Sequence, residues 1–95
     1  MTLEDLLKQD VAVIDVRTPM EFNSAHAEGS RNIPLSEIMM HLDTLQALNK
    51  PIVLVCASGN RSGQAALYLS QNGIPDVYNG GSWLNINYIH SLDSK

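Results

Sequence analysis

The chain has 95 residues, of which 44% are hydrophobic and 17% are charged. This size and composition predict a single globular domain over residues 1–95, and they exclude a disordered segment or a two-domain protein. Ten acidic against six basic residues give a net charge of −4, so we expect no binding to nucleic acid or to an anionic membrane.

Helices and short strands alternate in the first half of the predicted fold. Residues 2–8 carry a capping-box pattern, Thr-x-x-Asp, with leucines around it, which predicts a short helix. Residues 11–16 are nearly all apolar and mostly β-branched, as in a strand covered on both faces of a parallel sheet. The Thr-Pro-Met-Glu pattern at residues 18–21 predicts a second short helix that runs to about residue 23 or 24. Residues 31–33 predict a short strand that ends at Pro34.

The second half of the chain continues this alternation. Residues 36–49 have apolar side chains at helical spacing and predict a helix, and residues 51–55 predict another fully buried strand. Residues 62–72 predict an amphipathic helix that Gly73 closes in the left-handed conformation. Residues 75–78 predict a last short strand.

A turn signal, Asn-Gly-Gly at residues 79–81, follows that strand. Ser82 is then expected to cap a final helix with an apolar inner side formed by Trp83, Ile86 and Ile89. This order of elements predicts an α/β domain with a mostly parallel sheet of about four or five short strands, right-handed crossovers and helices on both faces. Functional sites in such sheets lie beyond the carboxyl ends of the strands.

Cys56 occupies such a position, directly after the most apolar predicted strand. Gly59 and Gly63 permit backbone angles that other residues resist, so the N–H groups of residues 57–62 can converge on one point at the start of a helix. Such a loop binds an anion. With a thiol at its base it favours the thiolate, lowers the pKa below the free value of about 8.5 and makes the sulfur a nucleophile.

Other side chains of this loop suit the same chemistry. Arg61 supplies a permanent planar charge that can pair with the oxygens of an oxyanion, and the hydroxyls of Ser58 and Ser62 are further donors. The alternative is that Cys56 simply continues the strand as a small buried hydrophobic residue. The Cys-x4-Arg-Ser pattern between a strand and a helix favours the nucleophile.

The same loop resembles the active-site loop of the rhodanese sulfurtransferases in its residues Cys56, Ala57, Ser58, Gly59, Asn60, Arg61 and Ser62. Three further segments resemble landmarks of that family, in the same order along the chain: Asp15-Val16-Arg17 with Glu21-Phe22, His26 and Gly29 leading into Asn32-Ile33-Pro34, and Gly80-Gly81 with Trp83. The resemblance covers about residues 13–83. It implies a three-layer α/β/α rhodanese-like domain with a parallel sheet between helices.

The resemblance also implies a reaction. Cys56 takes a sulfane sulfur from an anionic donor such as thiosulfate, becomes a persulfide, and passes the sulfur to an acceptor such as cyanide or a thiol. The substrate-binding residues on this reading are those of the loop: Arg61, Ala57, Ser58, Gly59, Asn60 and Ser62. The chain has no second cysteine to attack the persulfide from within, so an external acceptor, including an acceptor protein, must do so.

Three polar residues outside the loop are expected to support it. By strand parity Asp15 and Arg17 lie on one face near the end of their strand, which favours a buried brace for the neighbouring loops over a role in catalysis. We expect His26 to fix its loop, because transfer of sulfur to a thiolate needs no proton from it.

We expect no cofactor and no metal ion, because one cysteine and widely spaced histidines lack the spacing of metal ligands. The longest apolar run, residues 52–57, is far shorter than a membrane-spanning helix. The acidic start lacks the pattern of a signal peptide, and a lone thiol suits a reducing compartment. These features predict a cytoplasmic protein that does not enter a membrane.

Two other functions remain open. The first is a module of the same fold that only carries sulfur or docks a partner protein, without turnover. The second is a phosphatase with a cysteine and an arginine around an anion site. Those enzymes place five residues between the cysteine and the arginine, whereas this chain has four, and its smaller loop matches one sulfur atom better than a phosphate.

Overall fold

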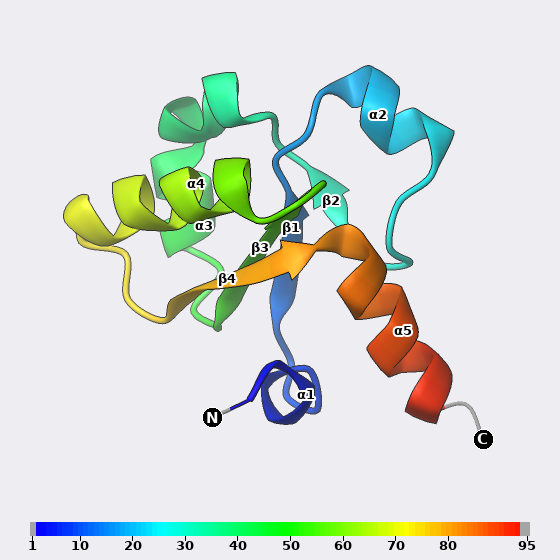
Figure 1. Ribbon diagram of the computed structural model, residues 1–95. Helices are drawn as coiled ribbons and strands as arrows, with labels where there is room; N and C mark the ends of the chain where they lie inside the picture. Colours follow the sequence, from blue (N-terminus) through cyan, green and yellow to red (C-terminus); the bar gives the residue numbers. More distant parts are fainter. Residues whose placement is uncertain (1, 94–95) are drawn as a thin grey trace.

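The computed structural model describes residues 2–93. The elements follow one another as α1 (Leu3–Leu6), β1 (Ala12–Asp15), α2 (Pro19–Ser24), β2 (Arg31–Asn32), the 3₁₀ helix η1 (Leu35–His41), α3 (Leu42–Gln46), β3 (Ile52–Cys56), α4 (Asn60–Gln71), β4 (Val77–Ser82) and α5 (Trp83–Asp93). The four strands form one parallel sheet in the order β2-β1-β3-β4 (Figure 1). The predicted α/β class and the parallel sheet are confirmed.

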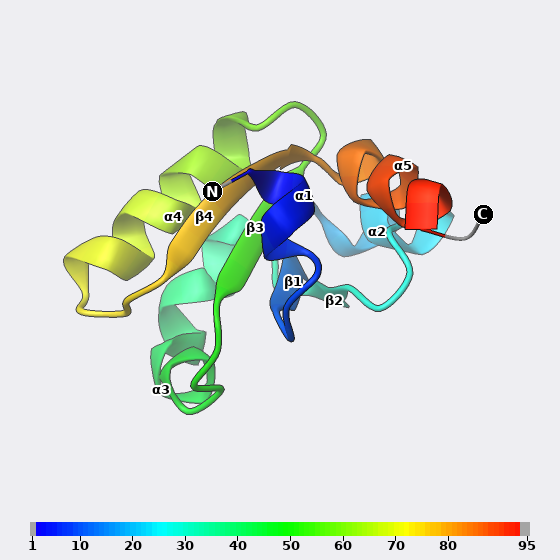
Figure 2. The same cartoon turned by 90° about the horizontal axis from the view of Figure 1, so that it is seen from below.

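Helices cover both faces of this sheet, as Figure 2 shows from below. The side chains of β1 and β3 are buried throughout, because alternate residues enter the core on opposite faces. On one face Ile14 and Leu54 pack with residues of η1, α3 and α4. On the other face Val13 and Val53 pack with residues of α1 and α5. No helix within residues 2–93 is long and apolar enough to cross a membrane.

The two predicted capping motifs are present. The hydroxyl of Thr2 accepts from the N–H of Asp5 at 3.0 Å at the start of α1. At the start of α2, Thr18 accepts from the N–H of Glu21 while the Glu21 carboxylate accepts from the N–H of Thr18, a complete capping box. Both motifs act within one helical turn, which is why the sequence alone predicts them.

The single helix predicted over residues 36–49 is wrong. The structure has the 3₁₀ helix η1 followed by the short helix α3, and at His41, between them, the backbone leaves helical geometry, with φ −109° and ψ 15°. Pro34 precedes η1 and provides no side-chain cap, and Asn49 adopts φ 53° beyond α3. The segment lacks a side-chain cap at its start and leaves helical geometry at His41, so it forms a 3₁₀ helix and a short α-helix instead of one long α-helix.

The turn predicted at residues 79–81 is also wrong, because these residues extend β4. The register between β3 and β4 shifts after Leu54, and Gly80 is the extra residue of the resulting β-bulge. A Cβ atom at Gly80 would lie 2.7 Å from Cγ1 of Val53. Glycine at this position therefore allows β4 to lie close to β3. It does not form a turn that reverses the chain.

The helix after the cysteine loop begins earlier than predicted. α4 starts at Asn60 rather than Ser62, directly after Gly59, which adopts φ 100°. Gly73 beyond its end adopts φ 82°, which confirms the predicted left-handed closure. The earlier start brings the first turn of α4 next to the end of β3.

Candidate active site

Cys56 is the last residue of β3, at the carboxyl end of the parallel strands. Alternation along the strand places its side chain on the same face as Ile52 and Leu54, in the hydrophobic cluster that α4 covers. Only 1% of the residue is exposed. The sulfur is therefore at the predicted edge of the sheet, but it lies beneath the following loop.

Two backbone N–H groups of that loop converge on the sulfur. The N–H of Gly59 donates to Cys56 Sγ at 3.0 Å and that of Ser62 at 3.4 Å, and Ser62 Oγ lies 3.3 Å from Sγ. We call Cys56 Sγ, the Gly59 N–H, and the Ser62 N–H and hydroxyl the sulfur cradle. Convergent N–H groups at the start of a helix stabilise negative charge, so the cradle suits a thiolate or a persulfide anion.

The pKa of the Cys56 thiol reflects two opposing effects. Burial raises this pKa, because the thiolate loses its hydration. Hydrogen bonds from the Ser62 hydroxyl and from the N–H groups of Ser62, Ser58 and Gly59 outweigh burial and lower the pKa from 9.0 to about 7. The cradle therefore supplies a nucleophilic thiolate near neutral pH.

This pKa can be measured without any substrate. Because Cys56 is the chain's one cysteine, the rate of alkylation by iodoacetamide against pH reports a single site. We expect a midpoint near pH 7 in the folded protein, following the pKa of about 7. In urea the midpoint should move to the free value of about 8.5. A folded-state midpoint at or above that value would mean that the cradle does not stabilise the thiolate.

Arg61, expected to hold the oxygens of a donor, forms an ion pair with α2. Its Nη1 donates to Oε1 of Glu21 at 2.7 Å and its Nη2 to Oε2 at 3.1 Å. The hydrogen bond from Arg61 is the largest cause that lowers the pKa of Glu21 from 4.5 to about 2, so the pair persists at neutral pH. The sequence placed Glu21 in the capping pattern of the second helix and in a landmark of the rhodanese resemblance, but not beside Arg61. Its second partner lies 40 residues away, and no local pattern indicates it.

Asp15 and Arg17 form a buried brace on the other face of the sheet. The Nε and Nη2 atoms of Arg17 donate to the Asp15 carboxylate at 2.8 to 3.0 Å. Nη2 also donates to the carbonyl of Ala25 at 2.7 Å, and the guanidinium lies 4.8 Å from the ring centroid of Trp83. The brace thus joins β1 to the loop after α2 and to α5.

His26 lies in the loop just beyond the end of α2. Its Nδ1 donates to the carbonyl of Phe22 at 2.8 Å, and the two rings stack with centroids 3.8 Å apart. Because a carbonyl can only accept, this contact assigns the hydrogen to Nδ1. The contacts of His26 are those of a residue that fixes its loop.

The other loop residues surround the cradle at the surface. Ala57, Ser58 and Asn60 are exposed. Asn60 accepts from Gln64 through Oδ1 at 3.1 Å, which fixes the first turn of α4. Ser58 lowers the pKa of Cys56 through its backbone N–H, whereas the sequence suggested its hydroxyl as the donor.

Sequence reasoning missed one residue that the fold brings to the loop. Asn79 of β4, expected in a turn, donates from Nδ2 to the carbonyl of Gly59 at 3.0 Å and accepts at Oδ1 from the hydroxyl of Ser62 at 2.7 Å. The Asn-Gly-Gly pattern indicated a turn, so nothing in the local sequence linked Asn79 to the cysteine loop.

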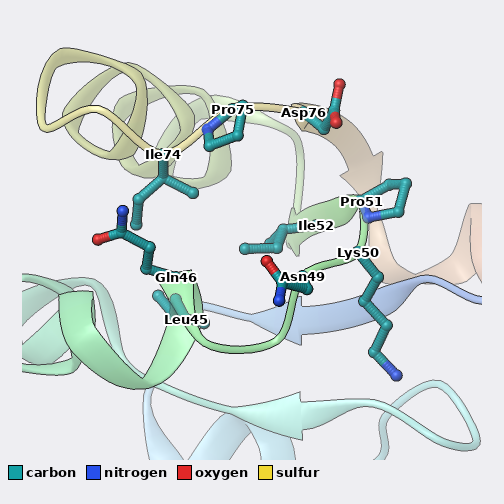
Figure 3. A pocket seen from close by; sticks show the side chains of 9 residues that line it. All are labelled: Leu45, Gln46, Asn49, Lys50, Pro51, Ile52, Ile74, Pro75 and Asp76. Carbon is teal, nitrogen blue, oxygen red and sulfur yellow. The ribbon is translucent and has the colours of Figure 1, made fainter.

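A cavity of about 300 Å³ lies at the opposite end of the sheet (Figure 3). Its lining includes Ile52, where β3 begins, and Asp76, just before β4. Cys56 ends β3, so this cavity is separate from the sulfur cradle. In the part of the chain that the structure describes, no group of three or more His, Cys, Asp or Glu residues is placed to hold a metal ion.

Comparison with curated proteins finds named sulfurtransferases among the relatives. The chain is 38% identical over 77 residues to the thiosulfate sulfurtransferase GlpE of Pseudoalteromonas translucida, covering 81% of this chain and 72% of that protein. It is 36% identical over 74 residues to the thiosulfate sulfurtransferase PspE of Escherichia coli, covering 77% and 71%. An uncharacterised Bacillus subtilis protein, YqhL, is 43% identical over 67 residues, which are 70% of this chain and about half (52%) of that protein.

Solved structures of the same fold agree. A rhodanese from E. coli, solved with anions, superposes with a TM-score of 0.73 at 35% identity, covering 80% of this chain and 91% of that one. A rhodanese-like domain protein from Staphylococcus aureus gives 0.74 at 31% identity, covering 87% and 86%. The family model of the rhodanese-like domain matches residues 2–83. Together with the cysteine loop and the parallel sheet, these matches show that the chain belongs to the rhodanese-like domain family.

Proposed function

We propose that the chain is a sulfurtransferase that carries a sulfane sulfur on Cys56, taking it from thiosulfate and passing it to a thiophilic acceptor such as cyanide or a thiol. The observation that carries this proposal is the sulfur cradle, in which the N–H groups of Gly59 and Ser62 point at Sγ. Relatives named as thiosulfate sulfurtransferases support the choice of donor.

The reaction has two displacement steps at sulfur. The Cys56 thiolate attacks the outer sulfur of thiosulfate, a new S–S bond forms, and the old S–S bond breaks with its electron pair leaving on sulfite. The acceptor then attacks the outer sulfur of the Cys56 persulfide. With cyanide the products are thiocyanate and the original thiolate, so donor and acceptor react in turn and the kinetics are ping-pong.

Arg61 binds the donor in this proposal while Glu21 holds its guanidinium in place. A guanidinium has five N–H donors, and the pair with Glu21 uses one each from Nη1 and Nη2. The remaining donors serve the oxygens of thiosulfate and of the leaving sulfite. Because Sγ is nearly inaccessible, the exposed residues Ala57 and Ser58 must shift to admit the donor.

Intact-mass analysis tests the proposal. Incubation with thiosulfate should add the mass of one sulfur atom to the whole chain, and cyanide should then remove it and release thiocyanate. Cys56→Ser is the matched control and should stay unmodified. A protein that stays unmodified after thiosulfate while its thiol remains free to alkylate would contradict the proposal.

The burial of the sulfur favours one second candidate, a carrier that delivers its persulfide to a partner protein without rapid turnover. Both a carrier and a sulfurtransferase should acquire sulfur from thiosulfate. A carrier should then release the sulfur to cyanide slowly, whereas a sulfurtransferase should release it as fast as it produces thiocyanate in the steady state. The phosphatase alternative has less support, because four residues rather than five separate Cys56 from Arg61. Hydrolysis of an aryl phosphate by the purified protein would instead support a phosphatase. We place the activity in the cytoplasm.

A further inference from the structure

The side-chain amide of Asn79 links β4 to the sulfur cradle. Its Nδ2 donates to the Gly59 carbonyl at 3.0 Å, and its Oδ1 accepts from the Ser62 hydroxyl at 2.7 Å and from the Gly81 N–H at 3.0 Å. These partners leave one orientation for the amide, since its nitrogen faces an acceptor and its oxygen faces donors. Asn79 thus holds Gly59 and Ser62, whose N–H groups donate to the sulfur at 3.0 and 3.4 Å.

The backbone around Asn79 is built for this approach. The β-bulge at Gly80 sets the register of the strand next to Asn79. On the facing side, a Cβ atom at Gly63 would lie 3.2 Å from Nδ2 of Asn79, so a glycine lets the first turn of α4 come close to the amide. The glycine of α4 therefore makes room for the Asn79 amide, while the glycine of β4 lets its strand lie close to Val53 and Val55.

The hydrogen of the Ser62 hydroxyl can serve only one acceptor at a time. Oδ1 of Asn79 has no hydrogen of its own, so the 2.7 Å bond between Ser62 and Asn79 must use the hydrogen of Ser62. While that bond exists, the 3.3 Å contact between Sγ and Ser62 Oγ can only be a bond donated by the thiol. To donate to a thiolate at Cys56, Ser62 must release Asn79.

We propose that Asn79 is a positioning residue that sets the ionisation of Cys56: it anchors Gly59 and Ser62, and it competes with the sulfur for the single hydrogen of the Ser62 hydroxyl. When the sulfur is protonated, the Ser62 hydroxyl donates its hydrogen to Oδ1 of Asn79. When the sulfur is a thiolate or a persulfide anion, the hydroxyl rotates and donates to the sulfur. The resting thiol and the reactive anion thus differ in the direction of one hydroxyl.

The charged groups around the cradle come from three elements. Arg61 of α4 has its pKa raised, first by its hydrogen bond to Glu21 of α2 and also by the negative charges of Cys56 and of Asp15 at the end of β1. Asp15 is itself paired with Arg17. Because Asn79 is neutral, an effect of Asn79 on Cys56 must pass through hydrogen bonds.

Asn79→Asp is the direct test, read as the alkylation midpoint of Cys56. Aspartate has nearly the same shape, holds the Ser62 hydrogen more strongly, and cannot donate to the Gly59 carbonyl, so each change disfavours the thiolate. We expect the midpoint to rise by about one pH unit. An unchanged midpoint in a folded variant overturns the proposal.

A double-mutant cycle with Ser62→Ala separates the hydroxyl route from the added charge. If Asn79 acts through Ser62, the shift caused by Asn79→Asp should fall to less than half in the Ser62→Ala background. An equal shift in both backgrounds would mean that the effect of Asn79 does not pass through the Ser62 hydroxyl, and would overturn the proposed competition for its hydrogen. Asn72→Asp, which adds a carboxylate at the far end of α4, where the amide donates to the carbonyl of Tyr68, should leave the midpoint within about 0.3 units.

Asn79→Ala supplies a second measurement if the aspartate variant does not fold. Loss of the anchor should speed amide hydrogen exchange at Gly59 and Ser62 by about fivefold, the effect of one hydrogen bond, while amides of β1 stay unchanged. Unchanged exchange at both residues would refute the anchoring role. None of these readouts uses a sulfur donor, so this inference and the proposed sulfur transfer can fail independently.

Discussion

Replacing Cys56 with serine is expected to reduce the transfer of sulfur from thiosulfate to cyanide by at least about 10³-fold. A serine hydroxyl is not ionised near pH 7, and an oxygen in this place cannot carry sulfur as a persulfide. Serine is slightly smaller than cysteine and can accept the same N–H groups of Gly59 and Ser62. The far-ultraviolet circular dichroism should therefore stay close to that of the unchanged protein.

Thiocyanate production at several protein concentrations measures this effect. The variant should also fail to acquire a sulfur atom in the intact-mass experiment. If Cys56→Ser keeps more than a tenth of the activity, the sulfur must travel by a route that does not include Cys56, and the proposed mechanism is wrong.

The second large effect is on stability. Asp15→Asn is expected to lower the free energy of unfolding by about 3–5 kcal/mol, because it leaves Arg17 charged and buried without its partner. Asp15 is 0% exposed and Arg17 is 5% exposed, so water cannot replace the lost carboxylate. A domain of this size has a total stability of about 5–15 kcal/mol, which makes the loss visible in a urea titration.

The chain offers a matched control for this measurement. Asp10 forms an ion pair with Lys50 at 3.3 Å, and the Asp10 side chain is 87% exposed. Asp10→Asn removes a charge of the same kind, but it should change the free energy of unfolding by less than about 1 kcal/mol. Equal losses in the two variants would show that burial does not decide the strength of the Asp15 pair.

Elements with local signals could be predicted from the sequence. β1 and β3 are apolar, β-branched runs whose residues are buried on both faces, and the caps of α1 and α2 need only residues within one turn. β4 could not be predicted over its full length. The same Asn-Gly-Gly pattern can reverse a chain or form a bulge, and the contact of Gly80 with Val53, which is tertiary, decides between them.

The candidate site likewise has a part with a local signal, which the sequence predicts, and a part formed by distant residues, which it does not. The loop from Cys56 to Ser62 is continuous, so its residue types and spacing already indicate an anion cradle. The contacts of Arg61 with Glu21 and of Ser62 with Asn79 join residues 40 and 17 positions apart. Such pairs depend on which elements the fold brings together, and a single sequence carries no periodic or spacing signal for them.

The place of Cys56 in the ladder between β3 and β4 limits what must move during the proposed sulfur transfer. Its backbone pairs with that of Ser82, so the sulfur stands on a rigid support at the carboxyl end of a strand that is buried on both faces. Addition of a sulfur atom can then be accommodated by the few exposed residues of the loop and by rotation of a hydroxyl. The loaded and empty forms should share one sheet geometry, and little reorganisation energy should separate them.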